Sequence, residues 1–250
     1  MKTLACIVPA YNEASELPRT LEALGDALGS LAPIETELIV VDNNSSDETA
    51  AVAQAHGARV VFEGHNQIAR ARNTGARATA ADALLFVDAD TRVAPALVQA
   101  AAARLRSGQV AGGGASIAFE GPVPPLARQC VASWNWLARQ LSLAAGSFVY
   151  IRRDAFEAIG GFSEKVYAGE EIHLSRALKR WARRHGMRME ILAAPPVRTS
   201  SRKFTWHGAW RVAALHTLLA VFPFLLSSRR VCAFWYARPQ PRSQKPAPAE

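Results

Sequence analysis

Short apolar runs alternate with segments of helical spacing over the first 110 residues. The runs lack polar interruption, which is typical of strands buried on both faces. They predict strands at Leu4–Val8, Glu37–Val41, Arg59–Phe62 and Ala83–Val87. Apolar residues three and four apart, together with a cap at Ser46/Asp47, predict helices at 14–31, 46–57, 67–80 and 95–105. This alternation predicts an α/β fold, with a doubly wound, mostly parallel sheet flanked by helices.

The second half of the chain has a less regular pattern. Gly112–Gly114 is interpreted as a break between the halves. Strands are then predicted at 115–119, 148–152 and 188–192, and helices at 126–143 and 170–185. We therefore expect one domain over 1–205, with a first half at 1–110 and a second half at 111–205.

The C-terminal part is apolar and basic. Ala209–Leu226 contains only three polar residues, and as a helix it would span about 27 Å, just short of a bilayer core of roughly 30 Å. We expect 206–237 to associate with a membrane surface. A buried core helix and a true span are the alternatives. The Pro-rich stretch 238–250 is expected to be a disordered tail.

Composition and charge agree with this division. The chain has 250 residues, of which 50% are hydrophobic, which is typical of a globular protein. Its net charge is +8, of which +1 belongs to residues 1–200 and +7 to residues 201–250. A basic end suits an anionic membrane or another polyanion, but no nucleic-acid motif accompanies it, so no nucleic-acid partner is expected.

The three cysteines and the N-terminus bear on the compartment. Cys6, Cys130 and Cys232 lie far apart, which argues against a disulfide framework and favours a reducing compartment. Pro9, Asn12 and Glu13 interrupt the first apolar run, so it does not read as a signal peptide. We expect a cytoplasmic protein, peripheral on the cytoplasmic face of the membrane.

Polar residues follow three of the predicted strands. Tyr11, Asn12 and Glu13 follow the first strand, Asp42 follows the second, and Asp88 and Asp90 follow the fourth. In an open α/β sheet, ligands bind beyond the carboxyl ends of the strands. The sequence therefore predicts a ligand site with several carboxylates at this edge.

Asp88-Ala89-Asp90 is the sharpest acidic element. Residues two apart on an extended chain point to the same side, so both carboxylates could share one Mg²⁺ or Mn²⁺. Alternatively, Asp90 caps the following helix and Asp88 is solvated.

Several motifs, in order, resemble family 2 glycosyltransferases. They are IVPAYNE at 7–13, VVDNNSSDET at 40–49, RNTG at 72–75, FVDADT at 86–91, AGSFVYIRRDAFEAIGGF at 145–162 and GEEIHLSRAL at 169–178. The likeness covers about residues 3–200. It implies a GT-A fold that binds a nucleotide-sugar, UDP- or GDP-linked, with a divalent metal.

The resemblance also implies roles for individual residues at the donor site. Those expected to line the nucleotide-sugar pocket are Pro9, Tyr11, Asn12, Glu13, Asp42, Arg72 and Asp88. Asp42 would bind the base, and Arg72 would approach the nucleotide from its helix, unless it is a solvated helix charge. Asp90 would bind the metal, and Asp88 would contact ribose or metal.

An acidic pair opens the helix predicted at 170–185. The family's base is the second residue of a Glu-Asp pair, so Glu171 matches it, although Glu is longer than Asp and Glu170 is an alternative base. Both could also be first-turn acids favoured by the helix dipole. Gly146, Ser147 and Gly161 are expected near the acceptor, with simple structural turns as the alternative.

Two further segments bear on the reaction. Ala177 stands where polymerising members of the family carry a glutamine, so we expect transfer of a single sugar. The stretch 199–203 (TSSRK) either contacts the diphosphate or a lipid phosphate, or is a plain basic loop.

We therefore expect an inverting glycosyltransferase that acts on a hydroxyl or phosphate acceptor. A lipid or lipid-linked acceptor follows if 206–237 associates with a membrane. The alternatives are a sugar-phosphate nucleotidyltransferase and a non-catalytic, membrane-docked nucleotide-binding protein.

Overall fold

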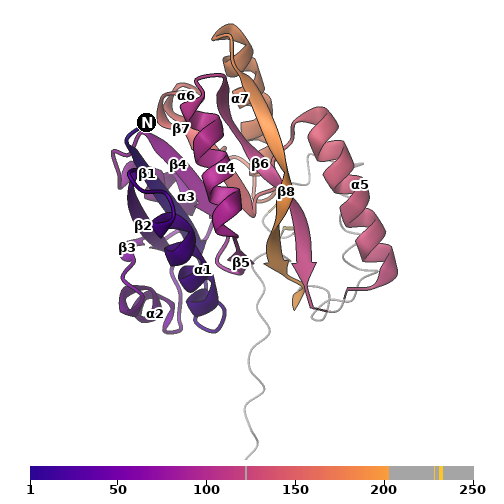
Figure 1. The fold of residues 1–250 in the computed structure, drawn as a ribbon. Coiled ribbons are helices and arrows are strands. Elements are labelled where there is room, and N and C mark those ends of the chain that lie inside the picture. Colours follow the sequence, from indigo (N-terminus) through magenta and orange to yellow (C-terminus); the bar gives the residue numbers. More distant parts are fainter. Residues whose placement is uncertain (122, 203–227, 229–230, 233–250) are drawn as a thin grey trace, which may run out of the picture.

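A single eight-stranded sheet runs through the chain (Figure 1). The computed structural model describes residues 1–121, 123–202, 228, 231 and 232. The strand order is β3-β2-β1-β4-β7-β6-β8-β5. The strands are β1 (Thr3–Ala10), β2 (Glu35–Asp42), β3 (Arg59–Phe62), β4 (Ala83–Val87), β5 (Thr91–Arg92), β6 (Val110–Glu120), β7 (Phe148–Arg152) and β8 (Arg188–Ser200).

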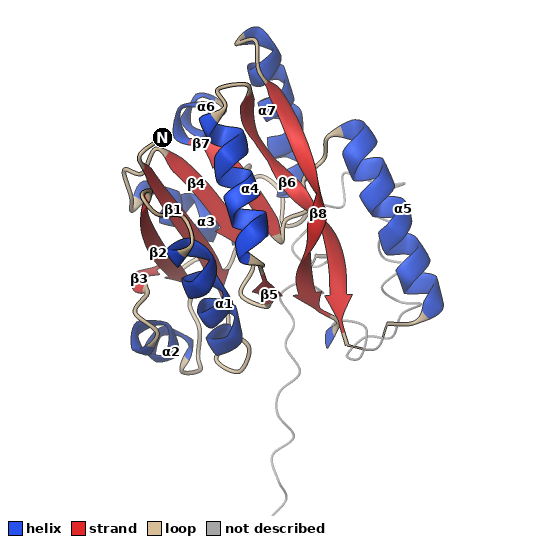
Figure 2. Ribbon diagram, in the orientation of Figure 1, coloured by secondary structure: helices blue, strands red, loops and turns tan. Residues whose placement is uncertain are grey.

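Helices cover both faces of this sheet (Figure 2). They are α1 (Leu17–Gly29), α2 (Thr49–Ala55), α3 (Ile68–Arg77), α4 (Pro95–Arg106), α5 (Pro125–Leu141), α6 (Arg153–Ala158) and α7 (Glu170–Arg184). Alternate residues of β1 enter two core layers. Leu4, Cys6 and Val8 belong to the layer that contains α1 and α4. Ala5 and Ile7 belong to the layer that contains α3, α6 and α7.

The prediction of an α/β fold with a parallel first half is confirmed. Strands β1 to β4 are all paired in parallel, in the order β3-β2-β1-β4. The second half is mixed, because β7 runs antiparallel to both β4 and β6, and β5 runs antiparallel to β8. β6 and β8 are parallel. Four of the seven strand pairs are therefore parallel.

Gly112–Gly114 does not separate two halves, so the predicted break is wrong. All three glycines lie inside β6, between β7 and β8. A Cβ on Gly113 would lie 1.7 Å from the carbonyl oxygen of Glu190 in β8. Glycine is needed at these positions because the neighbouring strands approach too closely to leave room for a side chain.

Three elements escaped the sequence pattern. β5 has two residues and α6 has six, too few to show a period. The strand predicted at 188–192 continues as β8 to Ser200, through Pro195 and Pro196. The ladder between β6 and β8 shifts register between Ala115 and Ile117, and prolines are tolerated in sheets at such irregularities.

The predicted membrane-associating segment, 206–237, lies outside the described residues except for positions 228, 231 and 232, and the predicted tail, 238–250, lies wholly outside them. Within the part that the structure describes, no helix is long and apolar enough to cross a membrane.

Candidate active site

The carboxyl ends of β1, β2 and β4 meet at one edge of the sheet. In the parallel register, Ala10 of β1 pairs with Asp42 of β2, and Ile7 pairs with Phe86 of β4. The loops that begin at Tyr11 and at Asp88 therefore emerge side by side, as predicted. This edge is where an open α/β sheet binds its ligand.

The loops after β1 and β2 are held together by hydrogen bonds. Asn12 has left-handed backbone (φ 51°), which asparagine tolerates better than most residues. Its amide donates to Ser45 Oγ at 3.0 Å, and its Oδ1 accepts from the Ser46 amide at 2.8 Å. Asp42 Oδ1 accepts from the Ser45 amide at 3.1 Å. These bonds hold together the two loops at which the nucleoside is predicted to bind, and that role stays a prediction. Pro9 beside them is buried, and Tyr11 is half-buried.

Arg72 lies at the centre of the site, inside the protein. Its side chain is only 1% exposed. Nη1 donates to Glu170 Oε1 at 2.6 Å, and Nη2 donates to Asp88 Oδ1 and to the Gly146 carbonyl, both at 2.8 Å. The guanidinium also lies 5.0 Å from the centre of the Phe162 ring. The alternative of a solvated helix charge is therefore wrong, because the side chain is buried among these partners, whereas a contact with the nucleotide stays a prediction.

The two glutamates that open α7 have different surroundings. Glu170 is buried and pairs with Arg72, which supplies the counter-charge that a buried carboxylate needs. Burial and, after it, the neighbouring Glu170 raise the pKa of Glu171 to about 8, against the opposing effect of Arg72. Glu170 is therefore held by its ion pair with Arg72, while Glu171 can exchange a proton near neutral pH.

Asp88 and Asp90 do not form the extended pair that the sequence suggested. Residues 88–90 turn, with the Thr91 amide donating to the Asp88 carbonyl at 3.0 Å. Asp88 pairs with Arg72, whereas Asp90 Oδ2 lies 3.4 Å from Arg202 Nη2. The predicted geometric reason for a shared cation is therefore wrong.

Asp90 nevertheless suits a hard divalent cation. Its contacts with Arg202 and with Thr199 Oγ1, at 3.4 and 3.5 Å, are at the outer limit for hydrogen bonds. Among the described residues, no group of three or more His, Cys, Asp and Glu side chains could hold a metal. A cation here would take one carboxylate from the protein and its other oxygen ligands from the substrate, as Mg²⁺ usually does.

Two of the three residues predicted near the acceptor, Gly146 and Ser147, are tied to the donor edge. The Gly146 carbonyl binds Arg72, and a Cβ on Gly146 would lie 3.1 Å from Arg72 Nη2. The Ser147 carbonyl accepts from the Asp88 amide at 3.4 Å. Gly161 (φ +70°) packs on Asn73, and a Cβ there would lie 2.8 Å from Asn73 Oδ1. Gly161 is thus needed for a turn, and an acceptor contact stays a prediction.

Sequence reasoning missed Asn73 as a site residue, and it named Arg202 only as part of the stretch 199–203, without its partner. Asn73 binds both backbone polar groups of Phe162: its Oδ1 accepts from the Phe162 backbone N–H, and its Nδ2 donates to the Phe162 carbonyl, each at 2.9 Å. Arg202 pairs with Glu13 at 2.7 Å. Asn73 belongs to the RNTG motif at 72–75, but no role was predicted for it. The pair between Arg202 and Glu13 spans 189 residues, so no local pattern could reveal it.

Solved structures share this fold. Staphylococcus aureus TarS matches with a TM-score of 0.62 at 18% identity, over 82% of this chain and 63% of TarS. Glucosyl-3-phosphoglycerate synthase from Mycobacterium tuberculosis matches with a TM-score of 0.59 at 22% identity, over 88% of this chain and 79% of that one. The mannosyltransferase PcManGT from Pyrobaculum calidifontis matches with a TM-score of 0.62 at 20% identity, over 94% and 70%. The fold is that of GT-A glycosyltransferases.

The sequence places the chain within this class. The family model described as Glycosyl transferase family 2 matches residues 5–160. The chain therefore belongs to glycosyl transferase family 2. An uncharacterized glycosyltransferase of Mycobacterium tuberculosis is 37% identical over 84 residues, which is 34% of this chain and 35% of that protein. The 4,4'-diaponeurosporenoate glycosyltransferase of Staphylococcus haemolyticus is 34% identical over 99 residues, 37% and 25% of the two chains. These matches span about a third or less of each relative's length.

Proposed function

We propose that this chain is a metal-dependent, inverting glycosyltransferase that moves one sugar from a nucleotide diphosphate to an acceptor hydroxyl or phosphate. The observation that carries the proposal is the buried chain of charges from Asp88 through Arg72 to Glu170, beside Glu171. It runs from the donor edge of the sheet to Glu170, whose neighbour Glu171 has a pKa of about 8. Family membership favours this reaction over nucleotidyl transfer.

The proposed donor is a UDP- or GDP-sugar. Solved structures with this fold include TarS in complex with UDP-GlcNAc and PcManGT in complex with GDP-Man and Mn²⁺. In this chain, the loops after β1 and β2 supply Asn12 and Asp42 at the carboxyl edge, where the nucleoside would lie.

Glu171 is the proposed general base. It would take the proton from the acceptor hydroxyl as the acceptor oxygen forms its bond to the sugar's anomeric carbon. The bond from that carbon to the diphosphate oxygen breaks, and its electron pair leaves with the diphosphate. Glu170 cannot serve equally well, because its carboxylate is buried and held by Arg72 at 2.6 Å. A base is most efficient when its pKa lies near the working pH.

Asp90 is the proposed protein ligand for Mg²⁺ or Mn²⁺. Such an ion, when bound, stabilises the negative charge that develops on a leaving diphosphate. Asp88 serves a different purpose, because its bond to Arg72 fixes the turn from which Asp90 projects. The metal is therefore proposed to bind only one of the two carboxylates in Asp88-Ala89-Asp90.

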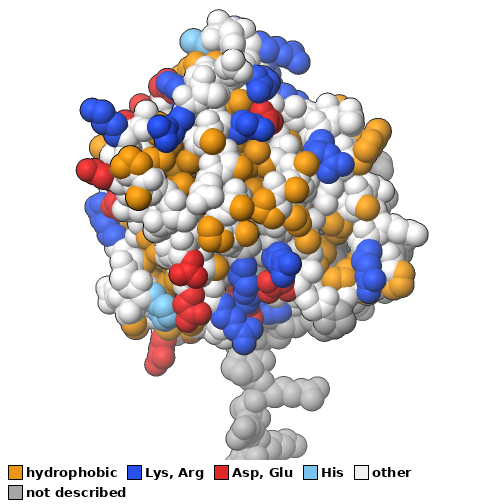
Figure 3. All heavy atoms as spheres, viewed as in Figure 1, with side chains coloured by type: hydrophobic (Ala, Val, Ile, Leu, Met, Phe, Trp, Pro, Cys, Tyr) orange, Lys and Arg blue, Asp and Glu red, His pale blue; other side chains and the backbone are white. Residues whose placement is uncertain are grey.

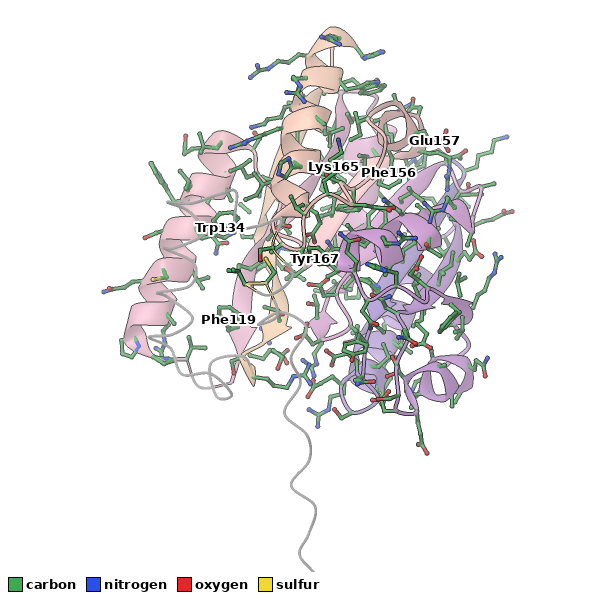
Figure 4. The ribbon with its side chains drawn as sticks, turned by 180° about the vertical axis from the view of Figure 1, so that it is seen from behind. Phe119, Trp134, Phe156, Glu157, Lys165 and Tyr167 are labelled. Carbon is green, nitrogen blue, oxygen red and sulfur yellow. The ribbon has the colours of Figure 1, made fainter. Side chains whose placement is uncertain are left out.

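The second half of the chain is the proposed acceptor side. Seen from behind, Figure 4 shows Phe119 on β6, Trp134 on α5 and Tyr167 close to the start of α7. All three side chains are half-buried. Aromatic faces of this kind offer contact area for an apolar or sugar-bearing acceptor.

We also propose that the protein associates with the cytoplasmic face of a membrane. Within the described residues, α5 exposes Trp136 (59%), Leu137 (39%) and Leu141 (49%), although large apolar residues are usually buried. Residues 121–153 contain no Asp or Glu. Figure 3 accordingly shows basic and hydrophobic side chains over α5. Basic and apolar surface together suit anionic lipid, which would make a lipid or lipid-linked acceptor accessible.

A panel of nucleotide-sugars tests the reaction. The purified chain is incubated with each donor and Mn²⁺, or with EDTA, and followed by thermal stabilisation and by slow donor hydrolysis. We expect one donor to stabilise the protein only with metal and to be hydrolysed. Glu171→Gln should abolish hydrolysis and keep binding, while the exposed control Glu157→Gln should change neither.

The alternatives predict different results in the same panel. A nucleotidyltransferase would consume a sugar 1-phosphate with a nucleoside triphosphate and release pyrophosphate. A non-catalytic protein would bind a nucleotide and turn over none of the donors. Flotation with anionic and neutral vesicles tests the membrane proposal, which fails if Trp136→Ser/Leu141→Ser floats as the unchanged protein does.

A further inference from the structure

Arg202 brings a positive charge to the donor edge from the far end of the described chain. It lies two residues beyond the end of β8. Its Nη2 contacts Glu13, which follows β1, at 2.7 Å, and Asp90, which follows β4, at 3.4 Å. One nitrogen therefore bridges two acids on loops that border the proposed position of the diphosphate.

The two contacts are unequal. The Glu13 side chain is 4% exposed and its bond to Arg202 is short, as expected for a charge-assisted hydrogen bond. The contact to Asp90 is 0.7 Å longer, and the Asp90 side chain is 14% exposed. Glu13 thus anchors the guanidinium, while Asp90 is held loosely and can exchange one cationic partner for another.

A divalent ion at Asp90 would meet this guanidinium at close range. Like charges repel strongly when few water molecules separate them. Without a nucleotide, therefore, Arg202 and a metal compete for Asp90. A diphosphate changes the balance, because its oxygens can bind both cations at once.

We propose that Arg202 occupies the cation position at Asp90 until a donor arrives, and then binds the donor's diphosphate beside the metal. The inference rests on the proposed function for the identity of the donor. It makes Arg202 a positioning residue that opposes binding of the metal alone and favours binding of metal and diphosphate together. The chain would thereby avoid loading metal without a donor.

Substitution of Arg202 should move two affinities in opposite directions. In Arg202→Gln, Mn²⁺ alone should bind more tightly by calorimetry or by Mn²⁺ electron paramagnetic resonance, by roughly fivefold or more, the lower end of typical coupling between sites. UDP or GDP with saturating Mn²⁺ should bind about tenfold or more weakly, because a charge-assisted contact is lost. Arg202→Lys should bind both Mn²⁺ alone and the nucleotide nearly as the unchanged protein does, because lysine keeps the positive charge.

A matched control separates this contact from a general loss of charge. Arg92 is near in sequence to Asp90 and pairs with Glu16 and Glu120 instead. Arg92→Gln should leave the ratio of the two affinities within about twofold of the unchanged protein. Should Arg202→Gln fold poorly because Glu13 has lost the guanidinium, Glu13→Gln/Arg202→Gln removes both charges and should still bind Mn²⁺ alone more tightly.

The outcomes are distinct. The inference is overturned if Mn²⁺ alone binds no more tightly to Arg202→Gln and to Glu13→Gln/Arg202→Gln than to the unchanged protein. An equal gain in Mn²⁺ affinity in Arg92→Gln would also overturn it. If no nucleotide binds while Arg202→Gln still gains Mn²⁺ affinity, the proposed donor is wrong, and the competition between Arg202 and the metal stands.

Discussion

Arg72→Met is the substitution for which the structure predicts the largest loss of stability at the site. Methionine keeps much of the volume and removes the charge and all the donors of Arg72. Glu170, which is buried, and Asp88 then lose their guanidinium partner. Leaving one member of a buried ion pair uncompensated costs about 3–5 kcal/mol.

The exposure of the two acids refines this magnitude. The Asp88 side chain is 26% exposed and can regain water, whereas that of Glu170 is 5% exposed and cannot. We therefore expect a loss of about 3–4 kcal/mol in the free energy of unfolding, set mainly by Glu170. In a chain of this size that corresponds to a fall of roughly 6–16 °C in Tm.

Urea and thermal unfolding measure this loss against two comparison variants. Arg59→Met removes an exposed pair with Glu37, formed at 2.9 Å, and should cost about 0–1 kcal/mol. Arg72→Met/Glu170→Gln should recover part of the loss, because a neutral amide replaces the uncompensated carboxylate. The reasoning is refuted if Arg72→Met loses less than about 1 kcal/mol, or if the double variant recovers nothing.

Further predictions concern catalysis, the metal and the sheet. Because the pKa of Glu171 is about 8, kcat/KM should rise with pH up to near pH 8. Glu170→Gln removes a neighbouring negative charge and should shift this rise to lower pH, and an unshifted pH profile would contradict the assignment of Glu171 as the base. The folded Glu171 carboxyl has a raised pKa, so part of the stability should be lost as pH rises from about 4.5 to 8, and Glu171→Gln should flatten this slope in unfolding titrations. Asp90→Asn should weaken Mn²⁺-dependent nucleotide binding at least tenfold in calorimetry, and full retention would exclude Asp90 as the ligand. Gly113→Ala should give little folded protein on expression, since its Cβ would lie 1.7 Å from the Glu190 carbonyl; normal yield and Tm would contradict that contact.

Local patterns predicted the first half of the fold well. Strands buried on both faces and helices with leucines three and four apart are encoded by neighbouring residues, and β1 to β4 and α1 to α4 lie where the pattern placed them. The carboxyl-edge position of Asp42 and Asp88 followed from the parallel order alone. The pattern failed at Gly112–Gly114, because a glycine run looks the same in a loop and in a strand crowded by its neighbours.

By itself, the sequence determined which chemical groups stand at the edge of the sheet, since side-chain type and position after a strand are both local properties. Only the tertiary structure decided which of those charged groups form ion pairs with one another. Arg72 reaches Glu170 across 98 residues and Arg202 reaches Glu13 across 189, so both pairings depend on how the completed sheet brings its loops together. That pairing holds Glu170 against Arg72 and leaves Glu171 with a raised pKa, because burial and nearby charge, more than residue type, set a pKa.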